Sequence, residues 1–224
     1  MAIRLRCAIT DRRGTFITFE GIDGAGKTTQ IQRLAAWLQE QGLRVVCTRE
    51  PGGTRIGDAV RSVLLNPRHT EMAARTEVLL YAASRAQLVD QIIRPALEEG
   101  AVVLCDRFVD ASIAYQGAGL GIGEEAVRAV NAFALGNLMP DLTLWFDIDW
   151  AQARERLLAA RGLGSLDRIE QRGADFFDRV ASAFRALQIA EPGRIRRIDA
   201  RLDVEAIQQE IKRVVWNHIN NDLE

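Results

Sequence analysis

The chain has 224 residues, of which 48% are hydrophobic and 26% are charged, and its net charge is −1 at pH 7. A chain of this size can bury enough apolar surface to fold without disulfides or a structural metal, and the composition excludes collagen-like and disordered classes. The balanced charge argues against a nucleic-acid partner, and no apolar stretch reaches the roughly 18 residues that a membrane span needs.

Along the chain, short apolar runs alternate with longer helical patterns. Strands that alternate with helices predict an α/β fold with a parallel sheet covered on both faces, whose ligands lie beyond the carboxyl ends of the strands. Strands are expected at residues 15–20, 44–48, 101–106, 142–147 and 195–199, and helices at 27–41, about 55–66, 71–99, 124–137, 149–160, 170–190 and 203–219.

Two segments differ from this pattern. Residues 1–14 fit no element and are interpreted as an N-terminal extension before a single domain over residues 15–224. Residues 161–173 hold three glycines and three arginines between two helical patterns, which is typical of a mobile cationic flap. The three cysteines, Cys7, Cys47 and Cys105, are scattered, so we expect free thiols in the cytoplasm, with Cys47 and Cys105 buried in strands.

The strongest motif is GIDGAGKT at residues 21–28, which matches G-x-x-x-x-G-K-[ST] between an expected strand and an expected helix. Glycines let the backbone point its N–H groups at phosphate oxygens, and the helix N-terminus adds partial positive charge. Lys27 can reach the β- and γ-phosphates of ATP. The alternative is a glycine-rich turn that matches by chance. The expected ATP-binding residues here are Gly21, Ile22, Asp23, Gly24, Ala25, Gly26, Lys27, Thr28 and Thr29.

A second motif is the apolar strand VVLCD, which ends in Asp106 and is followed by Arg107. A carboxylate in this position is typical of the metal site of P-loop proteins, and a hydroxyl at the end of the phosphate loop can bind the same ion. We therefore expect Mg²⁺ at Thr28 and Asp106, directly or through water. An Asp that only ends the strand is the alternative.

A P-loop alone does not separate switches, motors, ATPases and kinases. A GTPase would carry Asn-Lys-x-Asp, but Lys27 and Lys212 are the only lysines and neither lies in that motif. A second substrate site would favour a phosphotransferase.

Five segments in order, EGIDGAGKTTQ, TREPGGT, LLYAASR, DRFVDASIAYQGAGLGI and LDRIEQ, resemble the bacterial thymidylate kinase family over about residues 15–199. The resemblance implies a three-layer P-loop nucleoside monophosphate kinase fold, with a five-stranded parallel sheet and a short flap (LID). It also implies ATP-dependent phosphorylation of dTMP to dTDP, Mg²⁺ as cofactor and a homodimer. A kinase for another nucleoside monophosphate or for a deoxynucleoside, and a nucleotide-dependent regulatory switch, stay open as alternatives.

The resemblance assigns the sugar and phosphate contacts of dTMP to charged residues. Asp23 would contact the 3′-hydroxyl, while Arg49 and Arg107 would bind the phosphates that are joined. Glu50 would orient Arg49 or support the metal, and the bond before Pro51 is expected to be cis.

The base contacts come from two further segments. Tyr81 and Arg85 lie four residues apart and so share one helical face, where the family stacks an aromatic ring on thymine and donates to its O4. Ser112, Tyr115 and Gln116 would line the nucleoside pocket, with Tyr115 against the 2′ side of the sugar. The glycine-rich segment GAGLGIG that follows is interpreted as a loop.

Some family members carry a basic residue where this chain has Ala25, so the cation at the transferring phosphoryl group is expected from the flap. Arg161 is the first candidate and Arg168, also assigned to ATP, the second, whereas Arg172 is expected to stay in solvent. The expected catalytic residues are Lys27, Arg49, Asp106, Arg107 and Arg161.

Overall fold

The protein was analysed as a computed structural model that describes residues 13–162 and 166–221. Five strands form one sheet in the order β2–β3–β1–β4–β5, and every neighbouring pair is parallel. Their bounds are Thr15–Glu20 (β1), Val45–Arg49 (β2), Val102–Asp106 (β3), Leu142–Asp147 (β4) and Ile195–Asp199 (β5). The expected parallel α/β sheet is therefore confirmed, with strand boundaries shifted by at most one residue.

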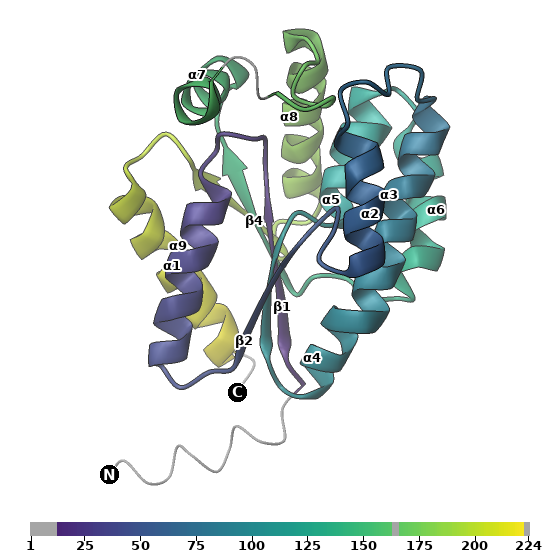
Figure 1. The fold of residues 1–224 in the computed structure, drawn as a ribbon. Helices are drawn as coiled ribbons and strands as arrows, with labels where there is room; N and C mark the ends of the chain where they lie inside the picture. Colours follow the sequence, from purple (N-terminus) through teal and green to yellow (C-terminus); the bar gives the residue numbers. More distant parts are fainter. Residues whose placement is uncertain (1–12, 163–165, 222–224) are drawn as a thin grey trace, which may run out of the picture.

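Helices cover both faces of the sheet (Figure 1). Helices α1 and α9 lie on one face, and α2 to α6 with α8 lie on the other, which gives three layers. The helix α7 lies beyond the carboxyl ends of the strands. The helical bounds are Lys27–Glu40 (α1), Arg55–Leu65 (α2), Ala74–Leu88 (α3), Arg94–Glu98 (α4), Val109–Ser112 (α5), Glu124–Leu135 (α6), Trp150–Arg161 (α7), Ala174–Ala190 (α8) and Val204–Asn221 (α9), with π-helical turns at Val89–Ile93 (η1) and Ile113–Gly119 (η2).

The register of the sheet brings the expected motifs to one edge. Phe19 of the central strand β1 lies opposite Asp106 of β3, and Arg49 of β2 lies opposite the same Asp106. The phosphate loop follows β1 directly, so its residues emerge beside the carboxyl ends of β2 and β3. All six residues of β1 are buried, which fixes the start of this loop against the core.

The helix expected over residues 71–99 is not one α-helix. It runs as α3, then widens into the π-helical turn η1, and continues as α4. Pro95 is the physical reason, because proline has no backbone N–H and its ring clashes with the carbonyl one turn earlier in an α-helix. A wider turn removes this clash without ending the helix.

The loop expected over GAGLGIG is partly wrong. Gly117 to Gly119 belong to the π-helical turn η2, which follows α5, and only the residues from Leu120 to Gly123 lie outside a helix. Gly119 packs against α8 so closely that a Cβ atom there would lie 2.5 Å from a ring carbon of Phe176. Glycine is therefore required by helix packing at this position rather than by a flexible loop.

The expected burial of Cys47 is also wrong. Cys47 lies on the edge strand β2 and is exposed, because that strand has a neighbour on one side only. Cys105 on β3 is buried as expected, and burial raises the pKa of its thiol. Cys7 and most of the expected N-terminal extension lie outside the described residues.

Within residues 13–162 and 166–221, no helix has the length and apolar character to cross a membrane.

Candidate active site

The phosphate loop, residues 21–28, turns sharply beneath α7. Gly21, Gly24 and Gly26 all have positive φ angles, of 126°, 86° and 89°, a region that side chains with a Cβ atom disfavour. At Gly24 a Cβ atom would also lie 2.1 Å from the carbonyl oxygen of Ala153 in α7. A side chain is therefore disfavoured at these three glycines, where the backbone itself can form the cradle.

Lys27 lies within this cradle and is buried. Its ammonium donates to the carbonyl oxygens of Gly21, at 3.1 Å, and Ile22, at 3.0 Å. Burial, together with the nearby Arg107, lowers the pKa of Lys27. A compact ammonium that loses hydration here gains from anionic oxygens, so the position suits polyphosphate binding.

Thr28 and Asp106 contact one another, as expected for two oxygen ligands of one ion. The Thr28 hydroxyl donates to Oδ2 of Asp106 at 3.0 Å. No cluster of three or more His, Cys, Asp or Glu side chains suited to a metal occurs in the described parts of the chain. Mg²⁺ needs few protein ligands when phosphates and water complete its octahedron, so one hydroxyl and one carboxylate fit this ion.

Arg107 joins the loop to the neighbouring pocket. Its Nη1 donates to the carbonyl oxygen of Gly21 at 2.7 Å, and its Nη2 forms an ion pair with Asp23 at 2.9 Å. The guanidinium also lies 5.0 Å from the ring centre of Tyr115. The φ angle of Arg107 is 71°, which is rare for a residue with a side chain.

A cavity opens beside Arg107. Of the eight residues expected to bind dTMP, seven line this cavity, namely Asp23, Tyr81, Arg85, Arg107, Ser112, Tyr115 and Gln116. The eighth, Arg49, lines an adjoining cavity together with Thr28 and Asp106, and Asp23 and Arg107 line both. Glu50 and Arg61 also line both, so the two cavities meet at these four residues.

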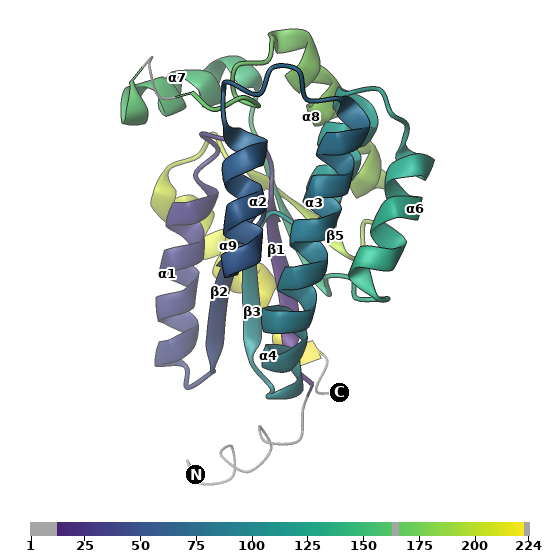
Figure 2. The same ribbon diagram turned by 45° about the vertical axis from the view of Figure 1, so that its right-hand side comes forward.

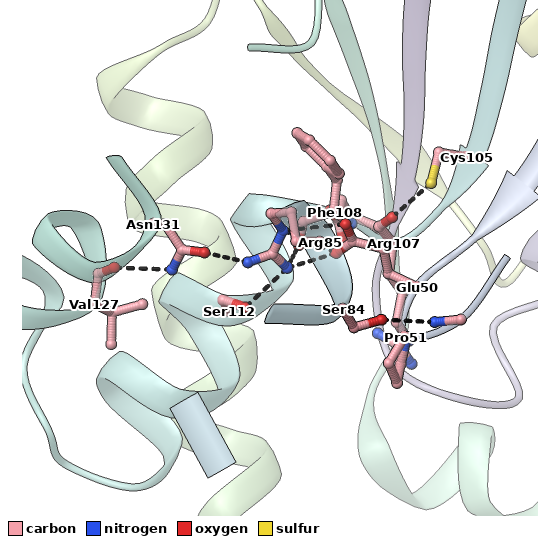
Figure 3. A network of polar contacts seen from close by, with 12 residues as sticks. Glu50, Pro51, Ser84, Arg85, Cys105, Arg107, Phe108, Ser112, Val127 and Asn131 are labelled. Atoms are coloured by element: carbon pink, nitrogen blue, oxygen red, sulfur yellow. Dashed lines mark hydrogen bonds and ion pairs between the residues drawn. The ribbon is translucent and has the colours of Figure 1, made fainter. Parts of the chain in front are cut away.

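Arg49 is exposed at the end of β2, where its Nη2 forms an ion pair with Asp58 at 3.1 Å. Glu50 follows it but turns the other way, into the core, and contacts Arg85 rather than Arg49 (Figure 3). The Glu50–Pro51 peptide bond is cis, as expected. The contacts of Glu50 therefore do not support its expected role in orienting Arg49.

Arg85 is buried, with 1% of its side chain exposed, and is held on several sides (Figure 3). Its Nε and Nη2 donate to the Glu50 carboxylate at 2.9 and 2.5 Å, and Nη2 also contacts Ser112 Oγ at 3.0 Å. Its Nη1 donates to Asn131 Oδ1, which leaves one of the two Nη1 protons for a ligand. The arrangement suits a fixed donor aimed at a carbonyl oxygen of a base.

The helical segment α5–η2 supplies Tyr115 and Gln116, which are nearly inaccessible to solvent. Tyr115 packs edge-on against Phe176, Phe177 and Phe184 of α8. Gln116 donates from Nε2 to Oε1 of Glu77 at 2.9 Å. Both side chains are therefore held in place by residues outside the cavity.

The flap arginines are arranged differently from one another. Arg168 donates to Glu77 Oε2 at 2.7 Å and to the carbonyl oxygen of Leu64 at 2.8 Å, so its contact with ATP stays a prediction. The expectation that Arg172 stays in solvent is wrong, because it also donates to Glu77, at 2.7 Å, and lies over the ring of Phe176. Arg161 ends α7, and its side chain lies outside the described residues.

Sequence reasoning missed three buried polar residues that shape the site, namely Glu20, Glu77 and Asn131. Glu77 had a signal, since it precedes Tyr81 and Arg85 at the same four-residue spacing on one helical face. Glu20 directly precedes the phosphate loop. Asn131 carries no sequence signal, because its partner Arg85 is far away along the chain.

Glu20 is a buried carboxyl group behind Arg107. Its Oε1 accepts a hydrogen bond from the backbone N–H of Phe108 at 2.8 Å, while Oε2 has no hydrogen-bond partner among the described residues. Burial, reinforced by the nearby Asp110, raises the pKa of Glu20 from 4.5 to about 8. The carboxyl group is therefore protonated at neutral pH.

Comparisons with known proteins agree with this geometry. The model of the family described as thymidylate kinase matches residues 19–211. A thymidylate kinase of Exiguobacterium sibiricum is 52% identical over 206 residues, which cover 92% of this chain and 96% of that protein. One of Lactobacillus delbrueckii is 48% identical, covering 87% and 92%. The crystal structure of thymidylate kinase from Ehrlichia chaffeensis is similar with a TM-score of 0.73 and 33% identity, covering 91% and 98%.

The buried proton of Glu20 predicts a stability that falls with rising pH. The folded protein keeps this proton up to about pH 8, whereas the unfolded chain releases it near 4.5. The contribution of this proton to the free energy of unfolding is thus complete below pH 4.5 and is lost as the pH rises through 8. The free energy of unfolding therefore falls by about 2 kcal/mol between pH 6 and 8.5. We expect Glu20→Gln to remove most of this pH-dependent fall in the free energy of unfolding, as measured by urea denaturation.

Asp199→Asn is the control, because hydrogen bonds from Arg201 lower the pKa of Asp199 to about 2 and it does not titrate in this window. The same pH slope in Glu20→Gln and in the parent protein would contradict the assignment of a proton to Glu20.

Proposed function

The chain belongs to the thymidylate kinase family, and we propose that it transfers the γ-phosphoryl group of ATP to dTMP, giving dTDP and ADP. The observation that carries this function is the junction of the two cavities at Asp23 and Arg107. A phosphate loop on one side and a pocket lined by residues expected to bind dTMP on the other support transfer between two nucleotides. We place the enzyme in the cytoplasm, where both substrates are found and where the free thiols Cys47 and Cys105 stay reduced.

On the ATP side, the backbone N–H groups of residues 21–28 and the ammonium of Lys27 bind the polyphosphate. The ammonium then exchanges the carbonyl oxygens of Gly21 and Ile22 for phosphate oxygens. Thr28 and Asp106 would hold Mg²⁺, which neutralises charge on the phosphates when it is bound. Asp106 lies opposite Arg49 in the sheet, so both signs of charge meet at the phosphates.

On the acceptor side, Arg107 and Arg49 bind the dTMP phosphate while Tyr81 and Arg85 bind the base. A dTMP phosphate oxygen attacks the γ-phosphorus in line, and the bond to the bridging oxygen of ADP breaks. A strong general base is unnecessary, because a phosphate monoester with a second pKa of about 6 is already largely dianionic. Positioning and charge neutralisation therefore supply most of the catalysis.

The transferring phosphoryl group needs one more cation, and Ala25 supplies none from the phosphate loop. We assign this role to Arg161, which stands at the end of α7 where the flap begins. Closure of the flap would bring its charge to the γ-phosphate and exclude water from the reaction.

We propose that the enzyme forms a homodimer through α2, α3 and α6, which lie side by side on one face (Figure 2). Large apolar side chains are exposed on all three helices, namely Ile56, Val63, Leu79 and Phe133, and Phe133 is 94% exposed. Exposed apolar side chains that gather on adjacent helices often mark a protein–protein interface. A second copy of the chain covers this patch with an identical one.

A panel of acceptors tests the reaction. With ATP and Mg²⁺, we expect rapid formation of ADP and dTDP from dTMP, and much slower turnover of dUMP, dCMP, dGMP and thymidine. The measurement is product formation by chromatography. A regulatory switch would instead hydrolyse ATP slowly without dTDP, and preference for another acceptor would identify a different kinase.

Substitution of the flap cation tests the assignment of Arg161. We expect Arg161→Ala to lower kcat by about 10³-fold, the effect of removing an arginine that stabilises a transferring phosphoryl group, with a much smaller change in dTMP affinity. Steady-state kinetics and calorimetric dTMP binding separate the two. Arg213→Ala on the exposed side of α9 is the control, and unchanged turnover in Arg161→Ala would rule out the assignment.

The dimer is tested by placing a charge in the apolar patch. We expect Phe133→Glu to give a monomer in light scattering at a concentration where the parent protein is a dimer, because two carboxylates would be buried at the interface. Ile189→Glu on α8 is the matched control, since Ile189 is 69% exposed outside the patch. A dimeric Phe133→Glu protein, or a monomeric parent, would refute this interface.

A further inference from the structure

Glu77 on α3 is a carboxylate on which donors from two distant segments converge. Only 1% of its side chain is exposed. Its Oε1 accepts from Gln116 Nε2 at 2.9 Å, and its Oε2 accepts from Nη2 of both Arg168 and Arg172 at 2.7 Å. The mechanism of phosphoryl transfer uses none of these contacts, so this buried cluster requires its own explanation.

Two of the donors belong to the described part of the flap, residues 166–173. Arg168 is fixed further by Leu64, whose carbonyl oxygen accepts from its Nε at 2.8 Å. The guanidinium of Arg172 lies 4.6 Å from the ring centre of Phe176. Charge-assisted hydrogen bonds to a buried carboxylate are among the stronger polar contacts in proteins. Glu77 is therefore the point at which this segment is attached to α3.

The attached segment forms part of the wall of the acceptor cavity. Asp167 directly precedes Arg168, Ile169 and Glu170 lie between the two arginines in sequence, and all three line the cavity. Oδ1 of Asp167 accepts from the backbone N–H groups of Ile169 and Glu170, so the segment keeps its own turn. Its position over the pocket then depends on the arginines at its two ends.

The third donor fixes how Gln116 faces the base. An ionised carboxylate only accepts hydrogen bonds, so the Gln116 amide must turn its nitrogen toward Glu77. Gln116 lines the cavity, and its amide oxygen, which Glu77 cannot bind, is the acceptor that it can present there. An acceptor oxygen pairs with the imide N–H of thymine, whereas the corresponding ring nitrogen of cytosine carries no proton.

We propose that Glu77 is a positioning residue for the phosphoryl acceptor, which holds the flap segment over the nucleoside pocket and orients the Gln116 amide toward the base. This role rests on the proposed function, because it assumes that the pocket binds dTMP. Glu77 itself touches neither substrate. The Glu77 carboxylate thereby couples the position of the flap segment over the pocket to the orientation of the amide that recognises the base.

The test compares Glu77→Gln with the parent enzyme in three measurements. We expect the dissociation constant and KM for dTMP to rise about tenfold with a smaller change in kcat, because acceptor binding is weakened. We expect the ratio of kcat/KM for dTMP over dCMP to fall about tenfold, because the Gln116 amide can now rotate. Trypsin should cleave after Arg168 and Arg172 at least fivefold faster, as identified by mass spectrometry.

Arg172→Met provides a second variant that keeps an apolar contact with Phe176 and leaves Glu77 and Gln116 in place. It should speed cleavage after Arg168 and raise KM for dTMP without changing the ratio of dTMP to dCMP. This variant decides the role of the flap attachment if Glu77→Gln does not fold. Glu124→Gln, which breaks an exposed ion pair with Arg128 on α6, is the control and should leave all three measurements unchanged.

Unchanged flap cleavage and unchanged KM in folded Glu77→Gln or in Arg172→Met would overturn the proposal. An equal loss of turnover with dTMP and dCMP, with no change in cleavage, would make Glu77 a purely structural residue and would also overturn it. Failure of the proposed function is distinguishable, because it would appear as absent dTMP turnover in the parent enzyme, whereas flap cleavage does not depend on activity.

Discussion

The guanidinium of Arg107 is the contact on which the geometry of the site depends. It donates to the carbonyl oxygen of Gly21 in the phosphate loop, forms an ion pair with Asp23 and lies over the ring of Tyr115. Its backbone takes a conformation that costs of order 1–3 kcal/mol and persists only when neighbouring contacts fix it. The bonds from Arg107 N–H to Phe19 and from Phe108 N–H to Glu20 supply that constraint. The two halves of the site are thus aligned before either substrate binds.

Buried arginines recur throughout this molecule, and they explain how an arginine-rich chain uses its charge. Arg85 satisfies acceptors on three other elements or turns at once, and Arg194 binds Asp110, Thr143 and Glu191 together. A planar guanidinium with five donors can connect several acceptors in a way that an ammonium cannot. Lys27 is the exception, because a compact charge fits among phosphate oxygens. The preference for arginine at sites with several acceptors, and for lysine in the phosphate loop, therefore follows from the geometry of the two side chains.

Local patterns in the sequence were sufficient for the sheet and the phosphate loop, whereas the residues that line the cavity beside Arg107 were expected from the resemblance to thymidylate kinases. Apolar runs that end in acidic residues locate strands because both faces of a parallel sheet are buried. The same reasoning did not reveal η2, since its glycines reflect the approach of Phe176 from α8. It misplaced Arg172 and overlooked Glu77, because a charged residue pattern is the same for a solvated flap and for one attached to a buried carboxylate. Contacts between distant segments decided these cases.

The wide turn at Val89–Ile93 has a consequence for the phase of the helix that carries Tyr81 and Arg85. The turn accommodates Pro95 because it contains more residues than an α-helical turn. The faces of α3 before it and of α4 after it are therefore rotated about the helix axis relative to a continuous α-helix. Leu97 beyond the turn stays buried, while Tyr81 and Arg85 before it line the pocket. Gain or loss of one residue within the turn would rotate these two parts by about 100° relative to each other. The orientation of Tyr81 and Arg85 toward the cavity thus depends on the length of a segment that does not line it.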